Sequence, residues 1–346
     1  LSNSEPSYKD AIAAIDGNIC RCTGYKSIER AAKHITGSLT GKDQNETIQW
    51  LVKQAFIPSY FNKIPTMLKE LSPIKDPHQN GTLVGGGTDL YVQKYDQLID
   101  QDVNLIVNSS ELRFTEVQNG VCSLGAGNSA TDMLESDDLQ AMFPQLAEHI
   151  KLVASSPIRN IATLGGNFVN ASPIGDFTVF FLALNSKLKL TENNQNRTIL
   201  LKDFYKGYKD LDKSAGEIIS AITFDIPDRN SQFNFEKVSK RITLDIASVN
   251  SAVQISVSDN KITQIHLSAG GVAPIPLYMG KTCTFLRGKE LSPRNIKSAN
   301  EVLQSEISPI SDVRGSAEYK RILLRQLYYA HFIKLFPNQF TLEQLI

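Results

Sequence analysis

Hydrophobic and polar positions change their spacing several times along the chain, and each change predicts a different kind of element. Near the start, Ser7 is a suitable N-cap for a helix over YKDAIAAID that ends at Gly17, and a second helix is expected over residues 27–35. The stretch TGSLTGKDQNE that follows is polar and has no regular period, which is typical of a linker. We therefore expect a helical domain over residues 1–36 and a linker over residues 37–46.

From about Thr47 onward, short strand-like segments alternate with helices, which predicts a second domain over residues 47–230. GTLVGGGTDLYVQ predicts a strand, a glycine turn and a helix, and FTEVQNGVCSLGAG predicts a hairpin that turns at Asn119-Gly120. A helical stretch over residues 138–152 precedes a second glycine turn within ATLGGNFVNASPIGD. KLKLTE, EIISAITFDIP and FNFEKVSK predict further strands.

The pattern changes again near Phe233, and residues 231–346 predict a third domain of α+β type. Two long strand patterns, ASVNSAVQISVS and KITQIHLSAGG, precede two helices. The last helix, over residues 316–336, should carry one apolar stripe. Its members are Tyr319, Ile322, Leu323, Leu327, Ala330 and Ile333. Taken over the whole chain, the pattern predicts the α+β fold class without internal repeats.

Composition and charge exclude several classes of protein. The chain has 346 residues, enough for two or three domains, and its 36 basic side chains balance its 36 acidic ones. No basic field favours nucleic acid, and apolar runs such as FTVFFLALN are too short to span a membrane. The start is polar and the four cysteines do not form a secreted disulfide framework. We therefore expect a cytoplasmic protein with neither nucleic-acid nor membrane partners.

The two glycine turns are the strongest candidates for binding chemistry, because successive backbone N–H groups can converge on an anion. VGGGTD is not a dinucleotide G-x-G-x-x-G motif starting at Gly85, which would need glycine in place of Leu90, and no P-loop tripeptide follows either turn. One such turn alone could equally be a tight strand-to-helix connection. Two in one domain favour a pyrophosphate held from both sides, with the Asp176 carboxylate on a sugar hydroxyl. Asp176 could also be an ordinary helix N-cap.

The remaining polar residues are weaker candidates. The five histidines lack the spacing of a helical metal site, so we expect surface or hydrogen-bonded core residues. KVSKR is a small basic cluster that could be a solvated face or could balance an anionic cofactor. Cys122 and Cys283 are expected to be small buried hydrophobes. Cys20 and Cys22 form a Cys-x-Cys pair that needs further ligands to hold a metal.

Together these stretches resemble the iron–sulfur and FAD-binding subunits of the molybdenum hydroxylases, in particular the small subunits of bacterial xanthine dehydrogenases. GNICRCTGYKSI is similar to the end of the helical two-iron two-sulfur domain, and LVGGGTDLYVQ and PIRNIATLGGNFVNASPIGD are similar to two FAD pyrophosphate loops. KVSKRITLDIASVNSA, GGVAPIPL and GSAEYKRILLRQL resemble the domain that follows. The resemblance implies a partial all-helical iron–sulfur domain, an FAD-binding fold of the vanillyl-alcohol oxidase type and an α+β C-terminal flavoprotein domain.

The resemblance also implies the ligands of each site. The FAD-binding residues would be Leu83, Val84, Gly85, Gly86, Gly87, Thr88, Asp89, Leu90, Thr163, Gly165, Gly166, Asn167, Asp176 and Lys237. Asp176 would hold a sugar or ribityl hydroxyl, and Lys237 would lie near the isoalloxazine ring. Cys20 and Cys22 would supply two of the four thiolates of a two-iron two-sulfur cluster, so the site is incomplete in this chain. Because the chain starts at Leu1, we expect an N-terminal truncation.

The activity that the resemblance implies is electron transfer in purine catabolism. A molybdopterin-binding large subunit would deliver electrons through iron–sulfur clusters to FAD and then to NAD, within a hetero-oligomer or dimer. Aldehyde oxidase and carbon monoxide dehydrogenase relatives are the alternatives. Carbon monoxide dehydrogenases keep the iron–sulfur and FAD parts on separate chains, so the joined parts here favour the xanthine dehydrogenase arrangement. A cofactor-free scaffold or assembly protein is the other class of function, and the intact glycine turns and Asp176 favour the enzyme.

Overall fold

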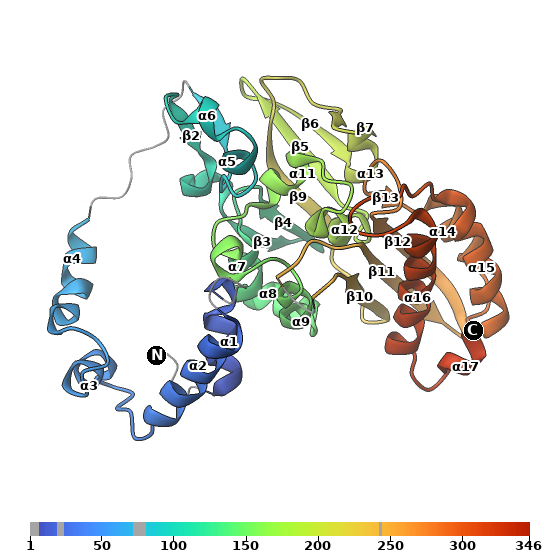
Figure 1. The fold of residues 1–346 in the computed structure, drawn as a ribbon. Helices are drawn as coiled ribbons and strands as arrows, with labels where there is room; N and C mark the ends of the chain where they lie inside the picture. Colours follow the sequence, from blue (N-terminus) through green and yellow to red (C-terminus); the bar gives the residue numbers. More distant parts are fainter. Residues whose placement is uncertain (1–6, 19–23, 72–80, 242–243) are drawn as a thin grey trace. The chain divides into compact units, whose positions relative to one another are not determined.

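The computed structural model describes residues 7–18, 24–71, 81–241 and 244–346 (Figure 1). It forms two compact units: Leu1–Asp76 with Ser155–Pro157, and Pro77–Ala154 with Ile158–Ile346. No helix in the described ranges is both long and apolar enough to cross a membrane.

The first unit is helical throughout its described elements. Its principal helices are α1 (Tyr8–Ala14), α2 (Lys26–Ser38), α3 (Thr47–Lys53) and α4 (Ile64–Glu70). The Ser7 side chain accepts a hydrogen bond from the Asp10 N–H at 3.1 Å, which confirms the predicted N-cap. The second predicted helix is α2, which runs a little further than expected. The turn with Cys20 and Cys22 lies outside the described residues.

The second unit contains a five-stranded antiparallel sheet in the order β3-β4-β9-β5-β6. Its strands are β3 (Thr115–Gln118), β4 (Val121–Gly125), β5 (Lys187–Glu192), β6 (Gln195–Leu200) and β9 (Ile218–Asp225). Asn119 and Gly120 both have positive φ, at 52° and 77°, so the predicted two-residue hairpin turn is confirmed.

The helices that lie between these strands along the chain are α7 (Ala130–Glu135), α8 (Asp137–Met142), α9 (Leu146–Lys151), α10 (Ser156–Arg159), α11 (Leu164–Asn170), α12 (Asp176–Leu182) and α13 (Leu201–Phe204). The single helix predicted over residues 138–152 was wrong, because the structure has two helices there, α8 and α9. Phe143 is extended at φ −127° and ψ 86°, as expected for a residue that precedes Pro144.

Two small sheets complete this part of the unit. β1 (Thr82–Val84) pairs in parallel with β2 (Val103–Leu105), and β7 (Tyr205–Gly207) pairs with β8 (Asp210–Leu211). Between β1 and β2 lie α5 (Leu90–Gln93) and α6 (Tyr95–Leu98). The first glycine turn therefore joins a strand to a helix, as the sequence predicts.

A second antiparallel sheet has the order β10-β11-β12-β13. Its strands are β10 (Ser231–Val238), β11 (Val249–Ser258), β12 (Lys261–Gly270) and β13 (Leu277–Tyr278), and its helices are α14 (Gly280–Leu286), α15 (Pro293–Glu306), α16 (Ala317–Leu335) and α17 (Leu342–Leu345). Strands β11 and β12 and the start of α16 lie where the sequence predicts them, and Ser316 is the N-cap of that helix. α16 packs on β10 and β11, and α14 packs on β12.

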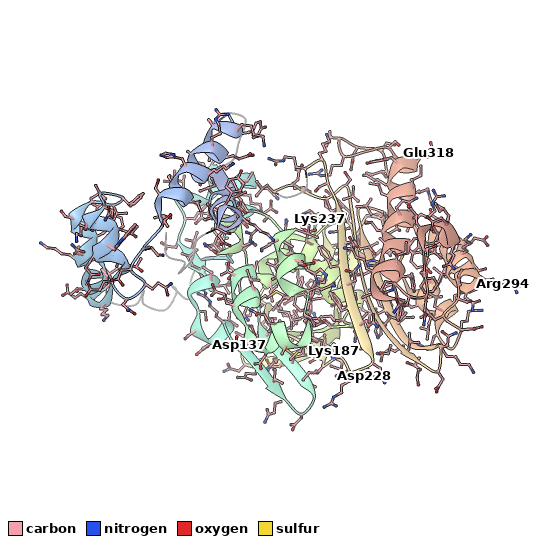
Figure 2. The ribbon with its side chains drawn as sticks, turned by 90° about the horizontal axis from the view of Figure 1, so that it is seen from below. Asp137, Lys187, Asp228, Lys237, Arg294 and Glu318 are labelled. Carbon is pink, nitrogen blue, oxygen red and sulfur yellow. The ribbon has the colours of Figure 1, made fainter. Side chains whose placement is uncertain are left out.

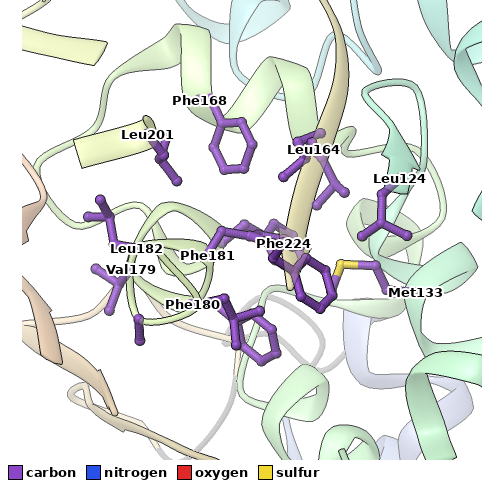
Figure 3. Packing of buried hydrophobic residues seen from close by; sticks show 14 of the residues in the cluster. Leu124, Met133, Leu164, Phe168, Val179, Phe180, Phe181, Leu182, Leu201 and Phe224 are labelled. Carbon is purple, nitrogen blue, oxygen red and sulfur yellow. The ribbon is translucent and has the colours of Figure 1, made fainter. Parts of the chain in front are cut away.

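α12 packs against both of the larger sheets. Every one of its residues after Asp176 is buried. The helix contacts β11 and β12, while its Phe181 ring lies 6.1 Å from the Phe224 ring of β9. Figure 3 shows Phe180, Phe181 and Phe224 close together in this core. Asp176 is therefore a charged residue at the end of a helix that is otherwise enclosed by apolar side chains.

The apolar stripe predicted for α16 was partly wrong. Tyr319 is 45% exposed and Ile322 is 43% exposed. The buried side chains are Lys320, Leu324, Leu327, Tyr328, Tyr329, His331 and Phe332. Lys320 and His331 can be buried because each has polar partners, and a pattern built on apolar residues alone misses that face.

His331 lies at the centre of a buried polar chain. Its Nδ1 accepts a hydrogen bond from Asn234 Nδ2 at 2.8 Å, so its ring proton is on Nε2, which donates to Ser251 Oγ at 3.0 Å. Ser251 Oγ donates to the Ser268 carbonyl, and Ser268 Oγ donates to the Val179 carbonyl of α12. Burial lowers the pKa of His331 to about 4. The charge of Glu236 opposes this shift of the pKa, and Lys334 and His149 add to it.

The unfolding free energy should therefore fall in mild acid. An unfolded histidine binds a proton below about pH 6.5, whereas folded His331 stays neutral down to about pH 4. Its contribution to stability is complete above pH 6.5 and is lost as the pH falls towards 4, by about 2 kcal/mol between pH 7 and pH 5. Between pH 7 and pH 5, His331→Phe should lose about 2 kcal/mol less unfolding free energy than the parent chain, as measured by urea unfolding. An equal loss in both would contradict the assignment of His331 as a neutral buried histidine.

Candidate functional site

The first glycine turn, Gly85 to Asp89, is closely enclosed by the second. A Cβ atom on Gly85 would overlap Thr163 Oγ1, and one on Gly86 would overlap the carbonyl oxygen of Ile161. Gly87 has φ +70°, which disfavours any residue with a side chain. Glycine is thus required at this turn both by its backbone conformation and by its contact with the second turn.

The two turns differ in their free hydrogen-bond donors. None of the described residues accepts a hydrogen bond from the N–H groups of Gly85, Gly86, Gly87 or Thr88. These consecutive donors can bind an anion, and the buried Asp89 Oδ2 nearby has no partner in the described part of the chain.

The second turn uses its N–H groups within the protein. Leu164 N donates to the Asn128 carbonyl and Gly165 N donates to the Ala126 carbonyl, both at 2.9 Å. Gly166 N donates to Thr163 Oγ1, the N-cap of α11. Contact of Thr163, Gly165, Gly166 and Asn167 with a ligand stays a prediction, and it would depend on groups other than these three N–H donors.

Asp176 is not the N-cap of α12, because Gly175 occupies that position, so the alternative interpretation as a cap was wrong. Its Oδ2 lies 2.7 Å from Lys237 Nζ and its Oδ1 accepts a hydrogen bond from Asn250 Nδ2 at 2.7 Å. The Lys237 side chain is only 3% exposed and also donates to the Leu152 carbonyl at 2.9 Å. Two predicted site residues, Asp176 and Lys237, are thus in direct contact, and Lys237 lies at the end of β10 (Figure 2).

Asn250 is a site residue that sequence reasoning missed. It lies on β11 directly opposite Lys237 of β10 in the strand register. Its position becomes apparent only when that register is known, because nothing in the local pattern of β11 marks a buried asparagine as part of a site.

A cavity of about 490 Å³ lies beside the segment that leads to Asp176. Its lining includes Ile174, Tyr208, Ile246, Ile310 and Arg314. Tyr208 and Ile310 are exposed, and among the described residues none pairs with the Arg314 guanidinium. The cavity therefore offers apolar surface next to the guanidinium of Arg314, with the Asp312–Lys320 ion pair also in its lining.

The buried cysteines and histidines of the described ranges have structural surroundings. In those ranges no group of three histidine, cysteine or acidic side chains could hold a metal. Cys122 and Cys283 are buried free thiols, and burial raises their pKa values to about 12 and about 11, which confirms them as unreactive core residues. His149, His266 and His331 are buried with hydrogen bonds.

Breaking the ion pair should destabilise the protein. Asp176→Ala would leave the Lys237 ammonium buried without its counter-charge, and we expect a loss of about 3 kcal/mol in unfolding free energy. The double variant Asp176→Ala/Lys237→Met should recover much of that loss because no unpaired charge remains. Urea unfolding measures both. Equal instability of the single and double variants would show that the ion pair is not the cause.

Comparison with known protein families matches two successive stretches of the chain. Residues 59–227 match the family described as the FAD binding domain in molybdopterin dehydrogenase. Residues 234–335 match the family described as the CO dehydrogenase flavoprotein C-terminal domain.

Individual relatives agree with these matches. The chain is 26% identical to the xanthine dehydrogenase of Emericella nidulans, over 96% of this chain but only 29% of that protein. It is 28% identical to the glyceraldehyde dehydrogenase medium chain of Sulfolobus acidocaldarius, over 75% of this chain and 92% of the relative. A solved structure of carbon monoxide dehydrogenase from Hydrogenophaga pseudoflava has a TM-score of 0.67 at 25% identity, over 76% of this chain and 90% of that one. The chain belongs to the FAD-binding subunits of the molybdenum hydroxylase family, oxidoreductases that include carbon monoxide and xanthine dehydrogenases.

Proposed function

We propose that the chain holds FAD and transfers electrons within a molybdenum-dependent hydroxylase of the xanthine dehydrogenase type. The observation that carries this proposal is the row of free N–H groups from Gly85 to Thr88. A pyrophosphate needs such donors, and the sugar and ribityl hydroxyls of FAD need acceptors such as the unpaired Asp89 Oδ2. When bound, FAD would supply the redox chemistry, while the protein binds and orients it.

Asp176 and Lys237 suit the other end of the cofactor. Asp176 has one contact on each carboxylate oxygen and its side chain is 14% exposed, so acceptor positions remain for a hydroxyl. Lys237 would lie near the isoalloxazine ring, but its charge is already balanced by Asp176. We therefore propose that it fixes the carboxylate more than it acts as a bare cation.

The proposed organisation follows the family. Residues 1–36 would end a two-iron two-sulfur domain in which Cys20 and Cys22 are two of the four ligands, residues 47–230 would bind FAD, and residues 231–346 would form the C-terminal flavoprotein domain. The Sulfolobus relative is named a medium chain, which supports assembly with a molybdopterin-binding large subunit.

NAD is the electron acceptor that we propose, and the cavity beside Asp176 supports it. A nicotinamide dinucleotide combines flat rings with a pyrophosphate, which suits the apolar side chains of Tyr208, Ile246 and Ile310 and the guanidinium of Arg314. An aldehyde or carbon monoxide dehydrogenase is the alternative that the relatives' names favour. A cofactor-free scaffold is disfavoured by the unpaired Asp89 oxygen, which suits a bound ligand better than an empty core.

Reconstitution with FAD should give a yellow protein with stoichiometric flavin. Gly86→Ala should abolish this binding, since the added Cβ overlaps the Ile161 carbonyl and displaces the donor turn. Gly280→Ala is a matched control, because a Cβ there meets nothing closer than Tyr278 at 3.9 Å. Absorbance after gel filtration measures the flavin, and circular dichroism checks folding. The absence of flavin in the parent chain, or full binding by Gly86→Ala, would contradict the site.

The FAD-loaded chain should lose its visible flavin absorbance when NADH is added without oxygen. Arg314→Ala should raise the NADH concentration required by about tenfold, the effect of losing one charge-assisted contact. The control is Arg294→Ala: Arg294 lies on α15 and not in the cavity lining, so its loss should leave the required NADH concentration unchanged. Anaerobic stopped-flow absorbance measures both. If NADH does not bleach the flavin, the acceptor is not NAD; if Arg314→Ala behaves like the parent, NAD binds elsewhere.

A further inference from the structure

Asn250 is fully buried on β11, and the two ends of its amide have different surroundings. Nδ2 donates to Asp176 Oδ1 at 2.7 Å and to the Ile174 carbonyl at 3.3 Å. Oδ1 is also buried, but no partner for it exists in the described ranges. An unpaired buried acceptor lowers stability, so its presence beside a candidate site requires an explanation.

Gly270 of β12 lies opposite Asn250 in the strand register. A Cβ on Gly270 would overlap Asn250 Oδ1 and would lie 3.0 Å from the Pro173 carbonyl. Any side chain at this position would displace either the amide or the segment that leads into α12. The absence of a side chain on Gly270 therefore allows the amide to keep its orientation towards Asp176.

The orientation of this amide follows from charge. A flipped amide would direct Oδ1 at the Asp176 carboxylate and place two acceptors against each other, whereas Nδ2 donates a hydrogen bond to a charged oxygen. Lys237 contacts the other carboxylate oxygen. Contacts on both oxygens fix the position and the rotation of the carboxylate, which a single ion pair would leave free to turn.

We propose that Asn250 is a positioning residue of the flavin site: its amide fixes the orientation in which Asp176 accepts a hydroxyl group of the cofactor, and Gly270 provides the space this requires. This inference rests on the proposed function, in which Asp176 binds a sugar or ribityl hydroxyl of FAD. Asn250 itself acts only through Asp176.

The first test is Asn250→Leu, which keeps a similar shape but removes both amide ends. The FAD dissociation constant, measured by flavin fluorescence, should rise about tenfold, because a misoriented Asp176 loses a charge-assisted hydrogen bond. The stability of the cofactor-free chain in urea should change little, because removal of the unpaired buried Oδ1 offsets the loss of the hydrogen bonds that Nδ2 donates. A purely structural role predicts the opposite pattern, with stability lost and FAD affinity kept.

Gln254→Leu is the matched control. Gln254 is another buried amide on β11, and its Nε2 donates to Ser231 Oγ at 3.1 Å, away from Asp176. FAD affinity should be unchanged in this variant.

The second test is Asn250→Asp, which has nearly the same shape and replaces the donor by a carboxylate next to that of Asp176. Two carboxylates at this distance share a proton. The FAD dissociation constant of this variant should therefore rise by about tenfold or more between pH 6 and pH 8, as that proton is lost. The parent chain should show a flat profile over the same range.

The outcomes separate the two proposals. If the parent chain binds no FAD, the proposed function is wrong and the role of Asn250 falls with it. If the parent binds FAD while Asn250→Leu binds it equally well and Asn250→Asp shows a flat pH profile, only the role of Asn250 is overturned. If Asn250→Leu does not fold, the pH profile of Asn250→Asp decides the question alone.

Discussion

The ion pair between Asp176 and Lys237 is the interaction on which the arrangement of the site depends. α12 is buried along its length, so the carboxylate at its first residue lies close to apolar side chains. In such surroundings the carboxylate needs a positively charged partner. That charge comes from β10 of the second sheet. Removing one partner of such a pair costs far more than replacing both, because a buried charge is left unpaired. Each of the two matched family domains thus supplies one partner of this ion pair.

The asymmetry of the glycine turns follows the same division of roles. One turn keeps four consecutive N–H groups free among the described residues, and the other uses its donors on the carbonyls of Asn128 and Ala126 and on its own N-cap, Thr163. A motif comparison treats both turns as equivalent ligand loops, because it records residue types and not hydrogen-bond partners. The local hydrogen bonding shows instead that, of the two turns, the first is the one that leaves its N–H donors without a partner in the described part of the chain.

Local features of the fold could be predicted from the sequence, and features set by distant contacts could not. The Asn119-Gly120 hairpin and the long strands β11 and β12 follow from short-range pattern and turn chemistry. The break between α8 and α9 was missed although Pro144 signals it. The buried face of α16 was missed because Lys320 and His331 are buried through partners on other elements. The residue pattern proposed Asp176 and the resemblance proposed a role for Lys237, but their contact spans 61 residues and depends on the fold.

The register of β10 and β11 also explains how Asn250 could escape notice. Neighbouring residues of a strand point to opposite faces of the sheet. Asn250 points to Asp176 of α12, while the adjacent Ser251 accepts a hydrogen bond from His331 of α16. One stretch of β11 therefore holds a neutral buried histidine on one face and the candidate site on the other. Because both contacts fix the same strand, the packing of α16 constrains the position of Asn250, although α16 itself contributes no residue to the ion pair.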